Sequence, residues 1–309
     1  MDALIEARGL TKRYGRTIAV DDLSFQVRSG EVTGFVGPNG AGKSTTMRIV
    51  LGLDAPNRGS ALVHGQPYGQ LGTPLREVGA LLDAAALHPG RRADHHLLWL
   101  AQSNDLPRDR VTEVLELVGL SDVARRRAGG FSLGMRQRLG IAAALLGDPP
   151  ILIFDEPVNG LDPEGVVWIR GFLRSLAAEG RAVFVSSHLM SELEDTADHL
   201  IVIGRGRLIA DTSVAELLRA ASNGSVTVRT PRGPELMSVL AGAGAVVTSS
   251  GADELTVIGL PAPRVAELAA ANALPLHELT PHRATLEQAY LQLTKDAVDF
   301  AAGRTRESR

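Results

Sequence analysis

Alternation of apolar and polar residues near the start of the chain predicts a strand, a loop and a helix in succession. Residues 17–28, TIAVDDLSFQVR, alternate like a half-buried strand, and residues 32–36 form a short apolar run typical of a buried strand. A glycine-rich stretch follows, and the segment from Thr45 to Leu51 is interpreted as a helix. This order of elements is typical of the first unit of a doubly wound α/β domain.

The pattern changes in the middle of the chain. Between residues 84 and 148 the apolar positions recur with the helical period and strand signals are few, which predicts an inserted helical subdomain. Residues 151–154 and 182–185 are again short apolar runs, and residues 201–209 predict a closing hairpin. We expect one domain to cover residues 1–220.

A second, smaller domain is predicted after AASNGS, residues 220–225, where Asn-Gly between small residues is turn chemistry. The pattern of residues 225–300 predicts a small α+β domain of the split βαβ type. Its predicted elements are a strand at 225–230, a helix at 234–241, strands at 244–249 and 253–258, a helix at 262–271, a strand at 276–280 and a helix at 284–293. Residues 301–309 are expected to form a flexible tail.

Composition narrows the classes of function. The 309 residues carry a formal net charge of −3, so no overall basic bias favours nucleic acid as a partner. The absence of cysteine excludes disulfides and thiolate metal sites. The N-terminus has no signal-peptide pattern, and no apolar run approaches the ~20 residues that span a bilayer. We expect a cytoplasmic protein whose membrane role, if any, needs a separate chain.

Candidate chemistry begins at GPNGAGKST, which fits the pattern G-x-x-x-x-G-K-[ST]. Glycines allow backbone N–H groups to turn toward an anion, and a helix start adds its positive dipole end. Lys43, one of only three lysines, can reach the β- and γ-phosphates of a nucleotide, and Ser44 can ligate Mg²⁺. A glycine turn with an incidental lysine is the alternative. The expected nucleotide-binding residues are Gly37, Pro38, Asn39, Gly40, Ala41, Gly42, Lys43, Ser44 and Thr45.

Two carboxylates follow the apolar strand ILIFDE, residues 151–156. A carboxylate at the end of a buried strand is costly unless it is paired or bound to a metal. Asp155 is expected to face the phosphate loop as a Mg²⁺ ligand, and Glu156 to polarise a water for in-line attack. A strand that simply runs into an acidic turn is the alternative.

A second candidate phosphate contact lies in FSLGMRQR, residues 131–138, just before a predicted helix. Ser132 stands at the N-cap position and Gly134 keeps the backbone accessible, so this helix start can bind an anion. On spacing alone a plain capped helix is favoured.

Six segments in order resemble the ATP-binding-cassette ATPases. They are Tyr14, the loop 37–45, FSLGMRQR, ILIFDEP, Gly160-Leu161-Asp162 and Ser187-His188. The likeness covers residues 3 to 215. It implies a P-loop NTPase cassette with a mostly parallel core sheet, an antiparallel β subdomain and the inserted helical subdomain. It also implies ATP and Mg²⁺ as cofactors.

In that family two cassettes pack head to tail around ATP. By resemblance, Ser132 and Gly134 contact the γ-phosphate bound by the other copy, and Tyr14 stacks on adenine. Asp162 lies at the cassette interface, and His188 holds the γ-phosphate and helps to position Glu156. The alternatives are an exposed turn aromatic for Tyr14, a helix start for Asp162 and a capping role for His188.

The sequence departs from the family pattern at the signature, which reads FSLGM where the family has LSGGQ. Leu133 replaces a glycine there, and Met135 replaces an amide. Asp83, in REVGALLDAAALHPG, stands where the family has glutamine, and we expect it to contact Mg²⁺ or water. A simple turn residue is the alternative.

The resemblance implies an energising subunit of a transporter. Such a subunit pairs with a second copy of itself and with an integral membrane permease on a separate chain, at the cytoplasmic face of the membrane. The C-terminal unit with LHELTPHRATLEQAYLQLT resembles the extension of bacterial drug- and antibiotic-exporting cassettes, which favours export. The alternatives are a soluble cassette ATPase acting on ribosomes or nucleic acid, and a P-loop kinase.

Overall fold

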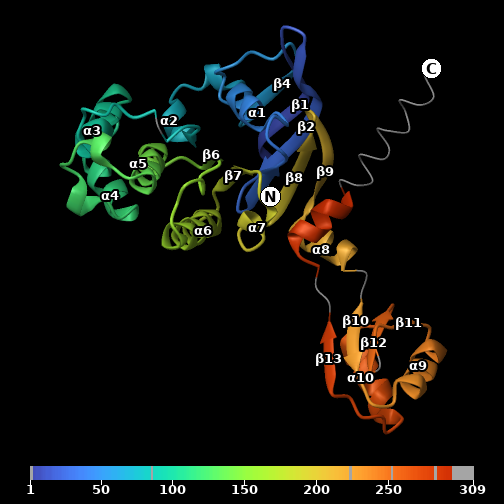
Figure 1. Cartoon of the computed structure of the whole chain (residues 1–309). Coiled ribbons are helices and arrows are strands. Elements are labelled where there is room, and N and C mark those ends of the chain that lie inside the picture. Colours follow the sequence, from blue (N-terminus) through green and yellow to red (C-terminus); the bar gives the residue numbers. More distant parts are fainter. Residues whose placement is uncertain (1–2, 85, 223–224, 252, 282–283, 294–309) are drawn as a thin grey trace. The chain divides into compact units, whose positions relative to one another are not determined.

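The computed structural model describes residues 3–84, 86–222, 225–251, 253–281 and 284–293 (Figure 1). The chain divides into two compact units, Met1–Ser213 and Val214–Arg309, each with its own buried core. The first unit therefore ends before residue 220, the expected end of the first domain. The tail expected at 301–309 lies outside the described residues.

Two sheets build the first unit. An antiparallel sheet has the order β2-β1-β4, with β1 at Ala3–Tyr14, β2 at Thr17–Arg28 and β4 at Arg58–Val63. The larger sheet has the order β5-β6-β7-β3-β8-β9 and is parallel except at its β8–β9 edge. Its strands are β3 (Val32–Val36), β5 (Val78–Leu81), β6 (Ile151–Asp155), β7 (Ala182–Ser187), β8 (His199–Gly204) and β9 (Arg207–Ser213). The predicted mostly parallel sheet with an antiparallel part is confirmed.

The helices of the first unit lie between its strands along the chain. The longer ones are α1 (Lys43–Val50), α3 (Ala93–Ser103), α4 (Asp109–Leu117), α5 (Leu133–Leu145) and α6 (Pro163–Ala178). Short helices are η1 (Tyr68–Gln70), α2 (Pro74–Glu77), η2 (Ser121–Val123), η3 (Ala128–Gly130) and α7 (Met190–Leu193). Figure 1 shows α3, α4 and α5 grouped together, away from the β2-β1-β4 sheet. These three helices give the helical character expected between residues 84 and 148.

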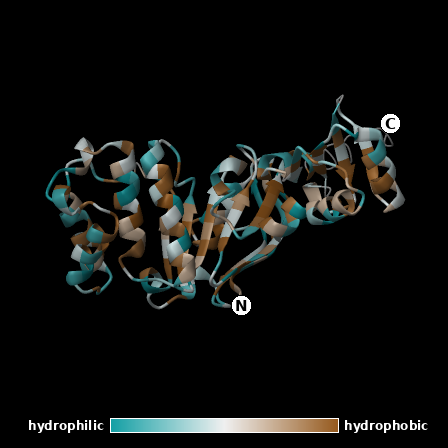
Figure 2. Cartoon of the chain, turned by 90° about the horizontal axis from the view of Figure 1, so that it is seen from below, coloured by the Kyte–Doolittle hydropathy of each residue, from teal (hydrophilic) through white to brown (hydrophobic). Residues whose placement is uncertain are grey.

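Three phenylalanines join the two sheets. Phe25 on β2 packs against Phe35 on β3 and Phe184 on β7, with ring centroids 5.5 and 5.6 Å away, and the rings of Phe35 and Phe184 lie 5.1 Å apart. All three are buried, and burial of one such ring stabilises the fold by about 1.5–3 kcal/mol. Hydrophobic residues accordingly concentrate on the strands of this unit (Figure 2). This packing fixes the strand ends from which the candidate site is built.

The second unit contains one four-stranded antiparallel sheet of order β11-β12-β10-β13. After α8 (Val214–Ala221) its elements are β10 (Val226–Arg229), α9 (Gly233–Gly242), β11 (Val246–Ser249), β12 (Glu254–Ile258), α10 (Ala262–Ala271) and β13 (Glu278–Pro281). Residues 286–293 are helical. The α+β architecture with the predicted order of strands and helices is confirmed, whereas α8 was not predicted. Within the described part of the chain, no helix is long and apolar enough to cross a bilayer.

Candidate functional site

The loop between β3 and α1 is shaped by glycine. A β-carbon placed on Gly37 would lie 2.4 Å from the carbonyl oxygen of Ile203, and one on Gly42 would lie 2.4 Å from that of Ala19. Gly42 also has a φ of +106°, which L side chains rarely adopt. The loop therefore needs glycine at these positions, and it leads directly into the N-terminus of α1 at Lys43. Such a loop followed by a helix start can bind phosphate.

Lys43 is folded back into this loop. Its side chain is only 6% exposed, and its ammonium donates hydrogen bonds to the carbonyls of Gly37 at 2.7 Å and Pro38 at 3.4 Å. The same nitrogen lies 3.4 Å from Oε1 of Glu156. A buried ammonium needs such partners, because burial of an unpaired charge is costly. The contact brings the end of β6 to the phosphate loop.

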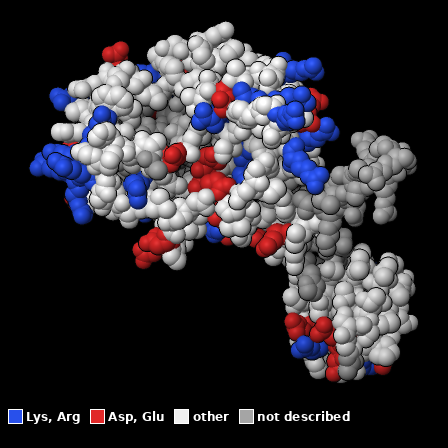
Figure 3. All heavy atoms as spheres, turned by 45° about the horizontal axis from the view of Figure 1, so that its top comes forward, with Lys and Arg blue, Asp and Glu red and all other residues white. Residues whose placement is uncertain are grey.

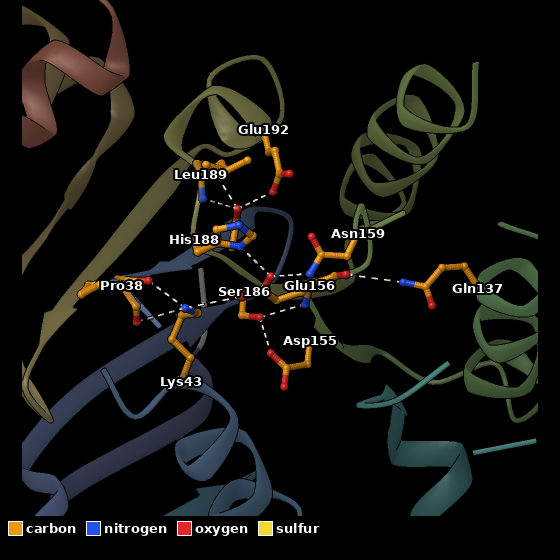
Figure 4. A network of polar contacts seen from close by, with 12 residues as sticks. Pro38, Lys43, Gln137, Asp155, Glu156, Asn159, Ser186, His188, Leu189 and Glu192 are labelled. Carbon is orange, nitrogen blue, oxygen red and sulfur yellow. Dashed lines mark hydrogen bonds and ion pairs between the residues drawn. The ribbon is translucent and has the colours of Figure 1, made fainter. Parts of the chain in front are cut away.

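Besides Lys43, the Glu156 side chain contacts Asn159 and His188 (Figure 4). Its Oε2 accepts a hydrogen bond from Nδ2 of Asn159 at 2.6 Å and lies 2.6 Å from Nδ1 of His188, which follows β7. Its φ of +50° is rare for a residue other than glycine and costs about 1–2 kcal/mol. Strained backbone of this kind clusters at functional sites, where surrounding contacts keep it in place. The side chain is therefore fixed between the loop and the end of β7.

The backbone at Asp155 and Glu156 is tied down by two buried polar side chains that the sequence did not single out. Ser186 on β7 donates to Oδ1 of Asp155, and its hydroxyl accepts from the backbone N–H of Glu156 at 2.9 Å. Gln137 on α5 donates to the carbonyls of Pro157 at 3.0 Å and Glu156 at 3.4 Å. Gln137 is 4% exposed. The one feature of the sequence that could have identified Gln137 is a polar residue at a position on the buried face of a helix.

A cavity of about 290 Å³ lies over the loop. Its lining residues are Tyr14, Ala19, Asn39, Gly40, Gly42, Lys43, Ser44, Thr45 and Glu156. The structure thus brings the end of β1, the loop, the start of α1 and the end of β6 to one place.

Tyr14 forms one wall of this cavity. Its hydroxyl donates to Oδ2 of Asp54 at 3.0 Å, and the ammonium of Lys12 lies 5.0 Å from the ring centroid. Burial, followed by the hydrogen bond to the Asp54 carboxylate, raises the pKa of Tyr14. Tyr14 is 48% exposed, so an aromatic ligand can reach it.

Ser132, Asp162, Asp83 and Gly134 are predicted site residues that lie away from this cavity. Ser132 caps α5 and accepts from the N–H of Met135 at 3.2 Å, and Asp162 caps α6 and accepts from the N–H of Gly165 at 2.8 Å. Asp83 follows β5 and lines a separate cavity of about 580 Å³, and Gly134 lies in the first turn of α5. The capping contacts match the structural alternatives for Ser132 and Asp162. The functional roles of all four residues stay predictions.

Metal binding was expected at Ser44, Asp155 and Asp83. No group of three or more His, Asp or Glu residues in the described ranges could hold a metal ion by itself. Mg²⁺ is usually held by one or two carboxylates together with substrate phosphates and water. The hydroxyl of Ser44 and the carboxylate of Asp155 are donor types that suit a magnesium–nucleotide complex.

Comparisons with known proteins identify the family. Residues 20–159 match the family described as ABC transporter, and residues 224–287 match a domain of unknown function (DUF8746). The bacitracin transport ATP-binding protein BcrA of Bacillus licheniformis is 41% identical over 68% of this chain and 70% of its own length. The Nod factor export ATP-binding protein I of Ralstonia nicotianae is 35% identical over 94% of each chain.

A solved structure shows the same likeness. The structure of cbiO1 from Clostridium perfringens, described as part of the ABC transporter complex cbiONQ, covers 77% of this chain and all (100%) of its own, with 27% identity and a TM-score of 0.63. Two relatives exceed 30% identity over more than two thirds of the chain, which is enough to assign the chain to their family. The chain belongs to the ATP-binding proteins of ABC transporters, which bind ATP and hydrolyse it to drive transport.

Proposed function

We propose that this chain hydrolyses Mg²⁺-bound ATP in a head-to-tail pair of two copies and thereby powers export through a separate membrane subunit. The observation that carries the proposal is the position of Glu156. Its carboxylate lies between the ammonium of Lys43 and the imidazole of His188, at the edge of a phosphate-binding loop. A base in contact with both phosphate-binding groups is positioned to act on water beside a γ-phosphate.

Each side chain has a separate task in this mechanism. Lys43 and the loop amides bind the β- and γ-phosphates, and Glu156 accepts a proton from the attacking water. His188 contacts the γ-phosphate and fixes the orientation of Glu156. Ser44 and Asp155 would hold Mg²⁺, which neutralises phosphate charge when bound. Asp83 remains a candidate for a further contact to the metal or to water.

Completion of the site by a second copy is supported by the start of α5. Ser132 is exposed, caps the helix and belongs to no wall of the cavity over Lys43. A helix start attracts anions, so Ser132 and Gly134 are suited to a γ-phosphate bound by another copy. We place Asp162 at the interface between the two copies. Tyr14 stacks on adenine at the other end of the nucleotide.

A membrane partner is proposed to dock on the second cavity, near α3. The lining of this 580 Å³ cavity is largely apolar and includes Leu51, Leu53, Tyr68, Leu81, Leu87 and His96. An apolar cavity at the surface often marks an interaction site, and a cytoplasmic helix of a permease would fill it. The description of cbiO1 as part of an ABC transporter complex agrees with this assembly. The chain would then act at the cytoplasmic face of the membrane.

Export of a drug, antibiotic or lipid-like compound is the proposed direction and cargo class. BcrA is named as a bacitracin transport protein. The Ralstonia relative is named for Nod factor export, and it matches along nearly the whole chain. On the face in Figure 3, acidic residues gather near the centre of the first unit and Lys and Arg lie toward its margins. Such a distribution does not favour the alternative of a nucleic-acid partner.

Two measurements test the proposal. Phosphate release by the purified chain should require ATP and Mg²⁺ and should fall to background in Glu156→Gln, with Glu116→Gln, an exposed change on α4, as the control. An affinity-tagged chain expressed in its own host should retain a polytopic membrane protein after detergent extraction. Full activity of Glu156→Gln would contradict the catalytic assignment. Co-sedimentation with ribosomes in place of a membrane partner would contradict the transport role.

A further inference from the structure

Leu133 is an unusual first residue for a helix that is proposed to face phosphate. It follows the cap Ser132, and 41% of its surface is exposed. A large apolar side chain at an anion-binding helix start gives no phosphate contact. Its neighbours in the structure suggest a different task.

The side chain of Leu133 lies on Gly160. A β-carbon placed on Gly160 would lie 2.1 Å from Cδ2 and 3.2 Å from Cγ of Leu133, so the leucine occupies the space of a side chain at residue 160. The next residues are also in contact range, because a β-carbon on Gly134 would lie 3.3 Å from Cδ2 of Leu161. Leu133 of α5 therefore lies on Gly160, and Leu161 of the loop between β6 and α6 lies near Gly134.

The same face of α5 also holds the beginning of this loop. Gln137 stands four residues after Leu133, one turn along the helix, and donates to the carbonyls of Glu156 and Pro157. The end of the loop is closed by Asp162, which caps α6. Through these contacts α5 fixes the segment from the candidate base Glu156 to the candidate interface residue Asp162.

We propose that Leu133 is a positioning residue that, through Gly160, joins the start of α5 to the loop 156–162 so that both move as one body. The proposal rests on the proposed function, in which Ser132 contacts the γ-phosphate of the other copy. Phosphate binding at Ser132 then shifts Glu156 and Asp162 of the same chain. In this view the leucine in FSLGM needs a glycine at residue 160, because a side chain at residue 160 would occupy the same space.

Amide hydrogen exchange in the nucleotide-free full-length chain tests the contact. The N–H groups of Asn159 and Leu161 bond to the carbonyls of Glu156 and Val158, both at 3.2 Å, and report on the loop. Leu133→Ala and Leu133→Gly should speed exchange in residues 157–165 by roughly two- to tenfold. Leu133→Met should restore slow exchange, and Val167→Ala, which removes an exposed apolar side chain of α6, should leave it unchanged. Wild-type exchange in both Leu133→Ala and Leu133→Gly would overturn the proposal.

A double-mutant cycle tests the coupling. Gly160→Ala should lower kcat more in the wild-type background than in Leu133→Gly, by about twofold or more, because only the leucine fills the space of the new methyl group. The backbone cost at φ +72° is common to both backgrounds. Leu133→Ala alone should lower kcat and leave ATP affinity unchanged, because Leu133 does not line the cavity of Lys43. Additive effects of the two changes would also overturn the proposal. Failure of the wild-type chain to pair on ATP would instead contradict the proposed function and leave the exchange result intact.

Discussion

Nδ1 of His188 lies 2.6 Å from Oε2 of Glu156, although the two residues come from the ends of different strands. The parallel register pairs Asp155 with Ser186 across β6 and β7, which brings the next residues of both strands to the same edge of the sheet. The contact fixes the two side chains relative to each other. In the proposed mechanism His188 would act on the attacking water through Glu156 as well as on the phosphate.

Replacement of His188 should slow hydrolysis more than it weakens nucleotide binding. His188→Ala removes a side chain that orients the base, and positioned proton-transfer groups contribute about 10²- to 10⁴-fold to a rate. We expect kcat to fall within that range and ATP affinity to change little. Phosphate release at saturating ATP measures the effect, with His95→Ala on the exposed face of α3 as the control. Equal activity of the two variants would show that His188 has no catalytic role.

Lys43→Ala should weaken ATP binding. A hydrogen bond to a charged group contributes about 1.5–3 kcal/mol, which corresponds to roughly a 10- to 150-fold loss of affinity. Nucleotide titration of the purified chain measures it, and Arg108→Ala, an exposed change before α4, controls for the loss of one positive charge. Undiminished affinity in Lys43→Ala would refute the assignment of the phosphate loop.

Tyr14→Ala should weaken binding of ATP and leave binding of inorganic triphosphate unchanged. Stacking of aromatic rings contributes about 0.5–1.5 kcal/mol, so we expect a roughly two- to twelvefold loss for the nucleotide alone. Tyr14→Phe keeps the ring but loses the hydrogen bond to Asp54, and should lie between wild type and alanine. A parallel loss of triphosphate binding in Tyr14→Ala would show that the ring does not act on adenine.

His96 on α3 gives a prediction on pH. Burial, followed by the nearby positive charge of Arg91, lowers the pKa of His96, and its Nδ1 is buried with no hydrogen-bond partner among the described residues. The unfolded chain therefore binds this proton more readily than the folded chain. The contribution of neutral His96 to the free energy of unfolding is complete above pH ~6.5 and is lost as the pH falls through the lower folded pKa.

Replacement of His96 should reduce that acid sensitivity. Urea unfolding of the chain between about pH 7.5 and pH 5 should show a smaller loss of unfolding free energy in His96→Gln than in wild type. His95→Gln, at the exposed neighbouring position, should behave like wild type. A wild-type slope in His96→Gln would show that His96 does not carry this effect.

Strands with an unbroken pattern were predictable from the sequence, and the interrupted strand β1 was not. The alternation of β2 and the apolar runs of β3 and β6 reflect one-sided and full burial, respectively. In β1 the pairing register shifts between Ala7 and Leu10, and Gly9 has a φ of +56°. Such a bulge breaks the alternation on which the prediction depends. The four-residue strand β5 was not predicted either.

The candidate site shows the same division. Lys43 and Glu156 were predicted from motifs and Tyr14 from the family resemblance, and the structure brings all three to one cavity. Asn159, Ser186 and Gln137 were not singled out, because their importance comes from contacts that folding creates. Ser186 is 30 residues from Glu156 and Gln137 is 19, and neither spacing leaves a local pattern. Asp83 was expected beside the metal, but it lines a different cavity, and its role stays a prediction.

The mass of Glu156→Gln in solution with ATP and Mg²⁺ tests the central claim most directly. Loss of the base should trap ATP between two copies, so sedimentation should give the mass of two chains with ATP and of one chain with ADP. Adding Ser132→Arg, which places a bulky side chain at the start of α5, should return the ATP-bound protein to a single chain. A single-chain mass for Glu156→Gln at saturating ATP would contradict the account.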